Sequence, residues 1–498
     1  MTQSVWAETA APRSYPPFDG RDLHFDVAVV GGGITGVTLA TLLRLAGKRV
    51  VLLEARSLAS GVTGGTTAHL TEALDTRYYE LESKFGAEGA RLAAKSTRDA
   101  IETVAGLTSQ FDIACDFERV PGYLYTERKD GVAELQRELD AARRAGISVE
   151  STPAPLPLSI RSALRFENQA QFHPTAYVLA LARHIPGDGS LICENSRVVT
   201  VDEGEPCRVH LEHGASLTAE YVALATHAPL NRLMLQTKVA HYRSYVVSGP
   251  IDNPPRALFW DTEDPYHYIR AQTFAGKAHW IIGGEDHKTG QESDTEAPFQ
   301  RIAEYAARLG MSTLTHRWSA QVIEPVDGLP FIGRNALSER VFIATGFSGN
   351  GMTYGTLAAK ILADLCLGND NPYASLYAAT RIKPLASLAS FLGENVDFPL
   401  HLVGDAIRPP EATSLKQIAR GEGKIAKISG QRLAVYRDDS GGLHALSSVC
   451  THLGCQVSFN AAERTWDCPC HGSRFDVSGA VLDGPAVRPL EKKNVVSE

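Results

Sequence analysis

Four residues near the C-terminal end could bind a metal centre: Cys450, His452, Cys468 and His471. They form two short patterns, C-x-H and C-x-x-H, and a further cysteine stands beside each pattern, Cys455 beside the first and Cys470 within the second. Thiolate and neutral imidazole are ligands that zinc and iron both accept. The four residues therefore predict either a tetrahedral zinc site or an iron–sulfur cluster with mixed ligands.

The two segments C-T-H-L-G-C (450–455) and C-P-C-H-G-S (468–473) resemble Rieske proteins of the disulfide-containing kind. The resemblance implies that Cys450 and Cys468 hold the inner iron of a [2Fe–2S] cluster and that His452 and His471 hold the outer iron. It also implies a disulfide between Cys455 and Cys470 that joins the two cluster loops. Ser473 would donate a hydrogen bond to the cluster. Phe475 stands where respiratory members carry Tyr, which predicts a reduction potential below the respiratory range.

Composition and charge limit the class of protein. A chain of 498 residues is too long for one core and predicts two or three domains. The net charge of −8 gives no basic footprint for nucleic acid, and no apolar run is long enough to span a membrane. Residues 1–24 have no secretory pattern and are expected to form an irregular arm, so we expect a cytoplasmic protein. The remaining cysteines lack metal-like spacing and are expected to be buried: Cys115, Cys193, Cys207 and Cys366.

A glycine-rich motif near the start predicts a dinucleotide site. The apolar run 25–30 leads into Gly31-Gly32-Gly33-Ile34-Thr35-Gly36, a helical pattern follows, and the next apolar run ends in Glu54. Strand, G-x-G-x-x-G, helix and a closing acid form the dinucleotide-binding fingerprint. Gly31 would make the turn, Gly33 would let the backbone approach a pyrophosphate, and Gly36 would let helix and strand pack closely. Glu54 could accept both ribose hydroxyls, which disfavours NADP.

Both NAD and FAD use this fingerprint, and the following loop favours FAD. The segment after Glu54, from Ala55 to Thr66 and Thr67, is rich in small and hydroxyl side chains. It resembles flavoproteins of the D-amino-acid oxidase/glycine oxidase superfamily. A second strand–glycine loop–helix, at 341–366, resembles the second FAD motif of that superfamily. The resemblance implies FAD contacts from Ile34, Thr35, Val199, Gly346, Gly349, Gly351 and Met352, and it leaves the role of His227 open.

A β-rich, aromatic region, about 235–320, resembles the antiparallel substrate sheet of this superfamily. Alternation along the strand 266–270 places Tyr266, Tyr268 and Arg270 on one face. Arg270, Tyr268 and Tyr245 are the candidate catalytic or substrate-binding residues, with Arg270 suited to a substrate carboxylate. A solvent-facing or salt-bridged Arg270 is the alternative.

The expected architecture has three parts. Residues 25–380 would form an α/β FAD-binding domain of Rossmann-like, glutathione-reductase type with the antiparallel substrate sheet inserted. Residues 381–412 would form a packed linker, and residues 413–498 would form an all-β Rieske domain.

Three functions remain open at this stage. In the first, the flavin dehydrogenates a C–N bond of an amine or amino acid and the cluster carries single electrons to an external acceptor protein. In the second, electrons run from the cluster to the flavin or to a partner oxygenase, although His279, Glu285 and His287 make no convincing iron motif. The third is a redox sensor without turnover.

Overall fold

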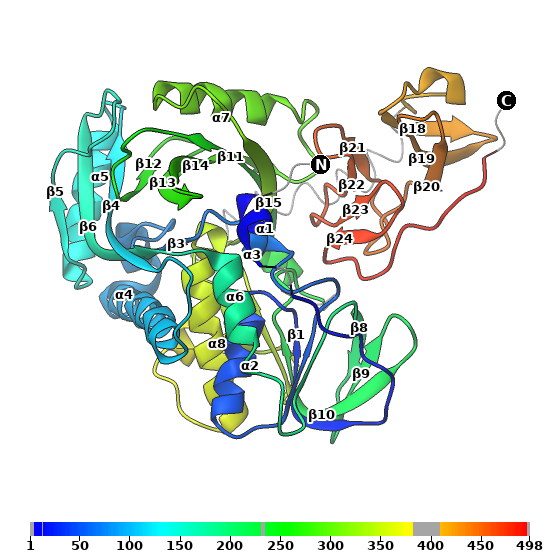
Figure 1. The fold of residues 1–498 in the computed structure, drawn as a ribbon, viewed down its shortest axis with the longest axis horizontal. Helices are drawn as coiled ribbons and strands as arrows, with labels where there is room; N and C mark the ends of the chain where they lie inside the picture. Colours follow the sequence, from blue (N-terminus) through cyan, green and yellow to red (C-terminus); the bar gives the residue numbers. More distant parts are fainter. Residues whose placement is uncertain (1–3, 12, 231–234, 382–408, 496–498) are drawn as a thin grey trace.

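The computed structural model describes residues 4–11, 13–230, 235–381 and 409–495. It contains two large sheets in the first 380 residues and two small sheets in the last 90 (Figure 1). Most of the expected linker, residues 382–408, lies outside the described residues. No described helix is long and apolar enough to cross a membrane.

The first large sheet has a parallel centre. Its strands run in the order β16-β17-β10-β1-β2-β7, with the pair β8–β9 attached to β10 and β16 antiparallel to β17. β1 and β2 are apolar and almost wholly buried because both faces of the sheet are covered. The strands are β1 (His24–Val30), β2 (Val50–Leu53), β7 (Leu191–Cys193), β8 (Val198–Asp202), β9 (Cys207–Leu211), β10 (Ser216–Leu224), β16 (Phe331–Arg334) and β17 (Val341–Thr345).

Helices cover one face of this sheet. α2 (Ile34–Leu45) and α8 (Gly351–Leu367) pack against each other, and α6 (Pro174–Ala182) and α4 (Tyr78–Gln110) flank them. Their apolar residues share one core with alternate residues of β1 and β2. α2 and α8 both begin at the carboxyl end of a central strand, so their N-termini lie at the edge of the sheet where ligands bind in such folds.

The second large sheet is mainly antiparallel and has the order β15-β11-β14-β13-β12-β4-β6-β3, with β5 paired to β6. α7 (Ala297–Arg308) packs on β11 and β14, and α5 (Gly131–Arg144) packs near β4 and β6. The strands are β3 (His69–Leu70), β4 (Glu118–Thr126), β5 (Val149–Ser151), β6 (Ser162–Gln171), β11 (Val239–Pro250), β12 (Leu258–Asp261), β13 (His267–Phe274), β14 (Lys277–Lys288) and β15 (His316–Pro325).

The C-terminal part is all-β. A three-stranded sheet contains β18 (Gly423–Ile428), β19 (Gln431–Arg437) and β20 (Leu443–Ser447). A four-stranded sheet contains β21 (Ser458–Asn460), β22 (Thr465–Asp467), β23 (Arg474–Asp476) and β24 (Val481–Asp483). The four-stranded sheet lies against the first part of the chain, and the three-stranded sheet lies on its outer side (Figure 1).

Short helices complete the described chain: α1 (Val5–Thr9), α3 (Val62–Gly65), α9 (Ala374–Tyr377), η1 (Gln236–Lys238), η2 (Ser348–Asn350) and η3 (Leu415–Gln417). α1 shows that the N-terminal arm is not wholly irregular. Trp6 of α1 is fully buried, and its indole N–H donates to the Thr66 carbonyl over 2.6 Å. The arm therefore holds the loop that the sequence assigns to FAD.

Candidate functional site

The four candidate metal ligands converge at the ends of the cluster loops. Cys450 follows β20 and Cys468 follows β22, and both are buried. Their thiols are neighbours: the Cys468 thiol lowers the pKa of Cys450, and the Cys450 thiol raises the pKa of Cys468. The rings of His452 and His471 lie 4.9 Å apart between centroids. Two adjacent thiols and two adjacent imidazoles form a donor set that fits a two-iron cluster with mixed ligands.

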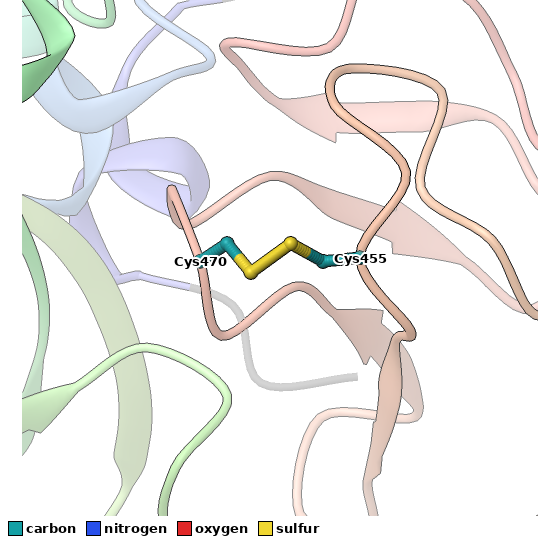
Figure 2. The surroundings of a disulfide bond; sticks show 2 residues. All are labelled: Cys455 and Cys470. Carbon is teal, nitrogen blue, oxygen red and sulfur yellow. A yellow bond between two sulfur atoms is a disulfide. The ribbon is translucent and has the colours of Figure 1, made fainter. Parts of the chain in front are cut away.

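Cys455 and Cys470 form a disulfide that joins the two loops (Figure 2). The sulfur of Cys468 lies within 4.8 Å of both disulfide sulfurs. These three cysteines are the only described group of three or more His, Cys, Asp or Glu side chains close enough together to suggest a metal site. Because two of them are bonded to each other, they cannot be its ligands, and the disulfide lies beside the cluster site.

Ser473 supports the cysteine pair. The residue is fully buried, its hydroxyl accepts a hydrogen bond from the Ala486 amide over 3.0 Å, and the same hydroxyl contributes to the lowered pKa of Cys450. Phe475 is also fully buried and packs in the core of the four-stranded sheet. The predicted lower potential stays a prediction.

A long pocket follows the edge of the parallel sheet and fits the adenosine and pyrophosphate of a dinucleotide. Its walls include most of the first predicted contacts: Gly31, Gly33, Ile34, Thr35, Glu54 and Ala55. Gly31 has φ +113°, and a Cβ there would lie 2.3 Å from the Ala225 carbonyl oxygen, so only glycine fits. The Glu54 carboxylate accepts the amides of Gly32 and Arg56, which fixes it in the pocket wall.

A second pocket continues from the first and opens under the antiparallel sheet. The two share Val62, Gln321, Ser348, Gly351 and Met352. The predicted contacts Thr66, Thr67 and Gly349 line the second pocket. A continuous groove that passes two helix N-termini is suited to FAD, with the flavin ring and a substrate under the sheet.

Three predicted FAD contacts lie elsewhere. Val198, and not Val199, lines the first pocket, because the strand bulges between Val198 and Thr200. Gly346 has φ +76° and turns the chain after β17, outside both pocket walls. Gly36 is also outside the walls; a Cβ there would lie 1.8 Å from the Gly31 carbonyl oxygen, so it serves packing, as expected.

Of the three candidate catalytic residues, the structure places only Tyr268 in the second pocket. Tyr245 lies on the opposite face of the sheet, against Phe299 of α7, and its hydroxyl pairs with His287. Arg270 shares the face of Tyr268 but is fully buried beyond the pocket, where it donates to the carbonyls of Thr67, Ala68 and Phe172. The structure therefore does not place Tyr245 or Arg270 in the wall of the second pocket.

Several pocket residues were missed by the sequence reasoning. Asp75, Trp260 and Ser244 line the second pocket, and Ser244 is hydrogen-bonded to the Tyr268 hydroxyl over 2.5 Å. Both oxygens of Asp286 are buried without a hydrogen bond of standard geometry, and burial raises the pKa of this carboxyl to about 7. Asp75 lies in a loop, and Ser244, Trp260 and Asp286 lie on three separate strands, so no sequence signal joins them.

The histidines near the pockets are neutral. Burial lowers the pKa of His69, in the second pocket, to about 3, and that of His227, in the first, to about 4. The ring nitrogens of His69 face the Thr67 hydroxyl and the Ile269 carbonyl. His279, Glu285 and His287 do not converge: Glu285 binds His267 and Arg301, whereas His287 binds Tyr245.

The cluster loop contacts the wall of the flavin pocket directly. Gln321 of β15 lines both pockets, and its side-chain amide donates to the Gly472 carbonyl over 2.8 Å. The same amide lies 3.3 Å from Nδ1 of His241, a buried residue of β11. Gly472 follows the candidate ligand His471, so one buried side chain joins the cluster loop to the flavin pocket.

An ion-pair network fixes the two parts together. Arg243 of β11 binds Glu463 through two hydrogen bonds of 3.0 and 2.9 Å and lies 3.5 Å from Asp483. Arg474 binds the same two carboxylates and Asp467. Burial opposes the charged forms, but the two arginines outweigh it and lower the pKa of Glu463 and of Asp483 to about 2.

Comparison with known proteins agrees with this arrangement. The family model described as FAD dependent oxidoreductase (DAO) matches residues 26–365, and the Rieske [2Fe-2S] domain model matches residues 410–494. The Bacillus subtilis (strain 168) protein YhfW, described as a Rieske 2Fe-2S iron-sulfur protein, is 33% identical over 496 residues, which cover 98% of this chain and 97% of that protein.

Other relatives match the first part of the chain. Gamma-glutamylputrescine oxidoreductase of Escherichia coli (strain K12) is 24% identical over 394 residues, 74% of this chain and 89% of that protein. Among solved structures, glycine oxidase from Geobacillus kaustophilus matches with a TM-score of 0.60 at 19% identity, covering 72% of this chain and 99% of that one. The last similarity establishes the fold alone.

Proposed function

Because this chain belongs to the FAD dependent oxidoreductase family and carries a Rieske [2Fe-2S] domain, we propose that it dehydrogenates a C–N bond of an amine or amino acid and delivers the electrons to an external acceptor protein. When bound, FAD would supply two-electron oxidation of the substrate and the [2Fe–2S] cluster would supply one-electron transfer. We propose Cys450, Cys468, His452 and His471 as cluster ligands.

The observation that carries this proposal is the contact of Gln321 with both sites. It is 1% exposed, it lines the pocket assigned to FAD, and it donates to the carbonyl beside His471. A buried contact between the two sites favours electron transfer within the chain over exchange with separate partners. His ligands raise a Rieske potential to about −150 to +300 mV, which favours the direction from flavin to cluster.

The chain's own residues prepare the substrate for this reaction. The antiparallel sheet covers the second pocket, and Trp260, Tyr268 and Tyr266 form an aromatic wall there. The neutral ring of His69 adds no positive charge beside an amine. Tyr268, held by Ser244, is the residue we propose to orient the reacting nitrogen.

An anaerobic titration of the purified protein with a panel of amines and amino acids tests the proposal. The flavin absorbance and the low-temperature EPR signal are followed together. We expect one donor to bleach the flavin while a signal of average g near 1.9 grows in step. If no organic donor bleaches the flavin and a reduced nicotinamide or ferredoxin reduces the cluster first, electrons run in the opposite direction and the proposal is wrong.

A matched pair of variants distinguishes electron transfer to the cluster from reduction of the flavin by substrate. Gln321→Leu removes the hydrogen bond to Gly472, whereas Gln236→Leu removes a similar bond to the Pro229 carbonyl from a buried glutamine that lines neither pocket. We expect Gln321→Leu to retain flavin bleaching and to slow growth of the EPR signal. Equal rates of cluster reduction in the two variants would argue against a route through Gln321.

A further inference from the structure

The ionisable groups in the wall of the second pocket bear on whether the substrate is an amine or an amino acid. Of the described residues that line it, Asp75 is the only carboxyl group and His69 is the only basic group; burial raises the pKa of Asp75 and lowers the pKa of His69 to about 3. No described arginine or lysine is in its wall. A substrate carboxylate in this pocket would therefore lose its hydration without gaining an ionic partner, which disfavours its binding.

Arg270 cannot supply that partner. One nitrogen of its guanidinium donates to three backbone carbonyls, a second donates to Gln272, and Trp6 of the N-terminal helix lies 5.3 Å from the group. Turning Arg270 into the pocket would break these bonds and leave three buried carbonyls unpaired. The Arg270 guanidinium therefore stabilises the loop 67–68 and is not available to a substrate.

The remaining features suit a cation. Trp260, Tyr266 and Tyr268 present aromatic rings to the pocket, and the Tyr266 and Tyr268 rings lie 5.7 Å apart. Aromatic faces attract ammonium groups. Asp75 accepts a hydrogen bond from the Gly349 amide at 2.5 Å, and no side chain among the described residues forms an ion pair with it. Behind Ser244 lies Asp286, a buried carboxyl whose oxygens accept no hydrogen bond of standard geometry.

We infer that the second pocket binds its substrate as an amine without an α-carboxylate, with the ammonium group held by Asp75 and the aromatic rings of Trp260, Tyr266 and Tyr268. The inference rests on the proposed function and narrows its substrate class from amines and amino acids to amines. Arg77, the nearest opposing charge at Asp75, donates to the Leu74 carbonyl and faces Glu134, so it leaves the carboxylate available.

The test compares amines with their α-carboxylated counterparts on the FAD-loaded, full-length protein. The pairs are 1,4-diaminobutane with ornithine and phenethylamine with phenylalanine, and benzoate serves as an anionic probe. Binding is measured from the shift of the flavin absorbance, and bleaching is measured separately. We expect each amine to bind at least about tenfold more tightly than its partner, and benzoate to cause no shift. Tighter binding of either amino acid, or of benzoate, would overturn the inference.

Asp75→Asn tests the carboxylate itself. The amide oxygen can still accept from Gly349, so the loop should remain in place, and amine binding should weaken about tenfold to a hundredfold. Asp188→Asn, a change at an exposed acid paired with Arg44, is the matched control and should bind like the wild type. Unchanged amine binding in Asp75→Asn would contradict the assignment. If the Asp75→Asn protein loses FAD, the comparison of each amine with its amino acid on the wild-type protein decides whether the inference holds.

The two proposals fail in different ways. If amines shift the flavin spectrum but no donor bleaches it, the dehydrogenase function is wrong and the amine site stands. If amino acids bleach the flavin faster than amines, the function stands and the substrate class is wrong.

Discussion

Arg243→Ala should release the C-terminal part from the flavin pocket. Arg243 is 5% exposed and is the only described cation from the first part of the chain in the buried network with Glu463 and Asp483. Without it, Glu463, Asp467 and Asp483 would share Arg474 alone. Breaking a buried pair by removing one partner costs about 3–5 kcal/mol, because the other charge stays desolvated. A loss of that size would reduce the docked fraction relative to the undocked one by about a hundredfold or more.

Two measurements follow the docking. Small-angle X-ray scattering reports the radius of gyration, and stopped-flow spectroscopy reports how fast the cluster is reduced after the flavin. We expect Arg243→Ala to enlarge the molecule and to slow cluster reduction while flavin bleaching is retained. Arg243→Lys keeps the charge but loses the two-point contact and should be intermediate.

Arg317→Ala is the matched control. Arg317 lies on the neighbouring strand β15 and pairs with Glu296, but both side chains are about 40% exposed. Exposed pairs contribute about 0–1 kcal/mol, so this variant should behave like the wild type. If Arg243→Ala keeps the wild-type radius and rate, the network does not hold the two parts together and the reasoning is wrong.

Three further predictions concern single sites. Burial raises the pKa of Asp286 from 3.8 to about 7; Asp75 and Glu285 also raise it, whereas Ser244 and His267 lower it. The raised pKa stabilises the folded protein fully below about pH 4, and this stabilisation should be lost as the pH rises to about 7. Asp286→Asn should therefore gain up to about 4 kcal/mol over the wild type at pH 8 and little at pH 4, measured as thermal stability; an equal gain at both would contradict the shift. Ser473→Ala should lower the cluster potential by about 40 mV in a redox titration, and a rise would refute the role of its hydroxyl. Cys455→Ser removes a disulfide between residues 15 apart and should cost about 3 kcal/mol of stability and lower the iron content; an unchanged iron content would show that the disulfide does not support the cluster.

The sequence predicted best where the residues that act together are close in the chain. Cys450 and His452, or Cys468 and His471, lie within one loop each, and the cysteines beside them join the loops. The G-x-G-x-x-G motif is likewise one turn between a strand and a helix, and its first residues line the pocket. Apolar runs and alternation also predicted strands in both large sheets and in the C-terminal part, because these patterns depend on residues that are close in the chain.

The substrate residues could not be predicted in the same way. Alternation correctly placed Arg270 on the face of Tyr268, but it could not show that Trp6, 264 residues earlier, and the loop 67–68 cover that position. Tyr245 and Ser244 are neighbours in the chain, and only the position of α7 decides that Tyr245 faces the helix and Ser244 the pocket. Choosing between two faces of a strand needs the partner elements, which the sequence does not place.

The close approach at Gly472 indicates that the docked arrangement is a feature of the fold. Gly472 has φ +68°, and a Cβ there would lie 2.6 Å from Cβ of His241 and 2.7 Å from the side-chain nitrogen of Gln321. A side chain at this position would push the loop of His471 away from β11 and β15. Because the loop that carries a candidate iron ligand also packs without a side chain against the flavin pocket, the contact of Gly472 with the side chains of His241 and Gln321 sets how closely the two sites approach each other. This contact supports the proposed transfer of electrons within the chain.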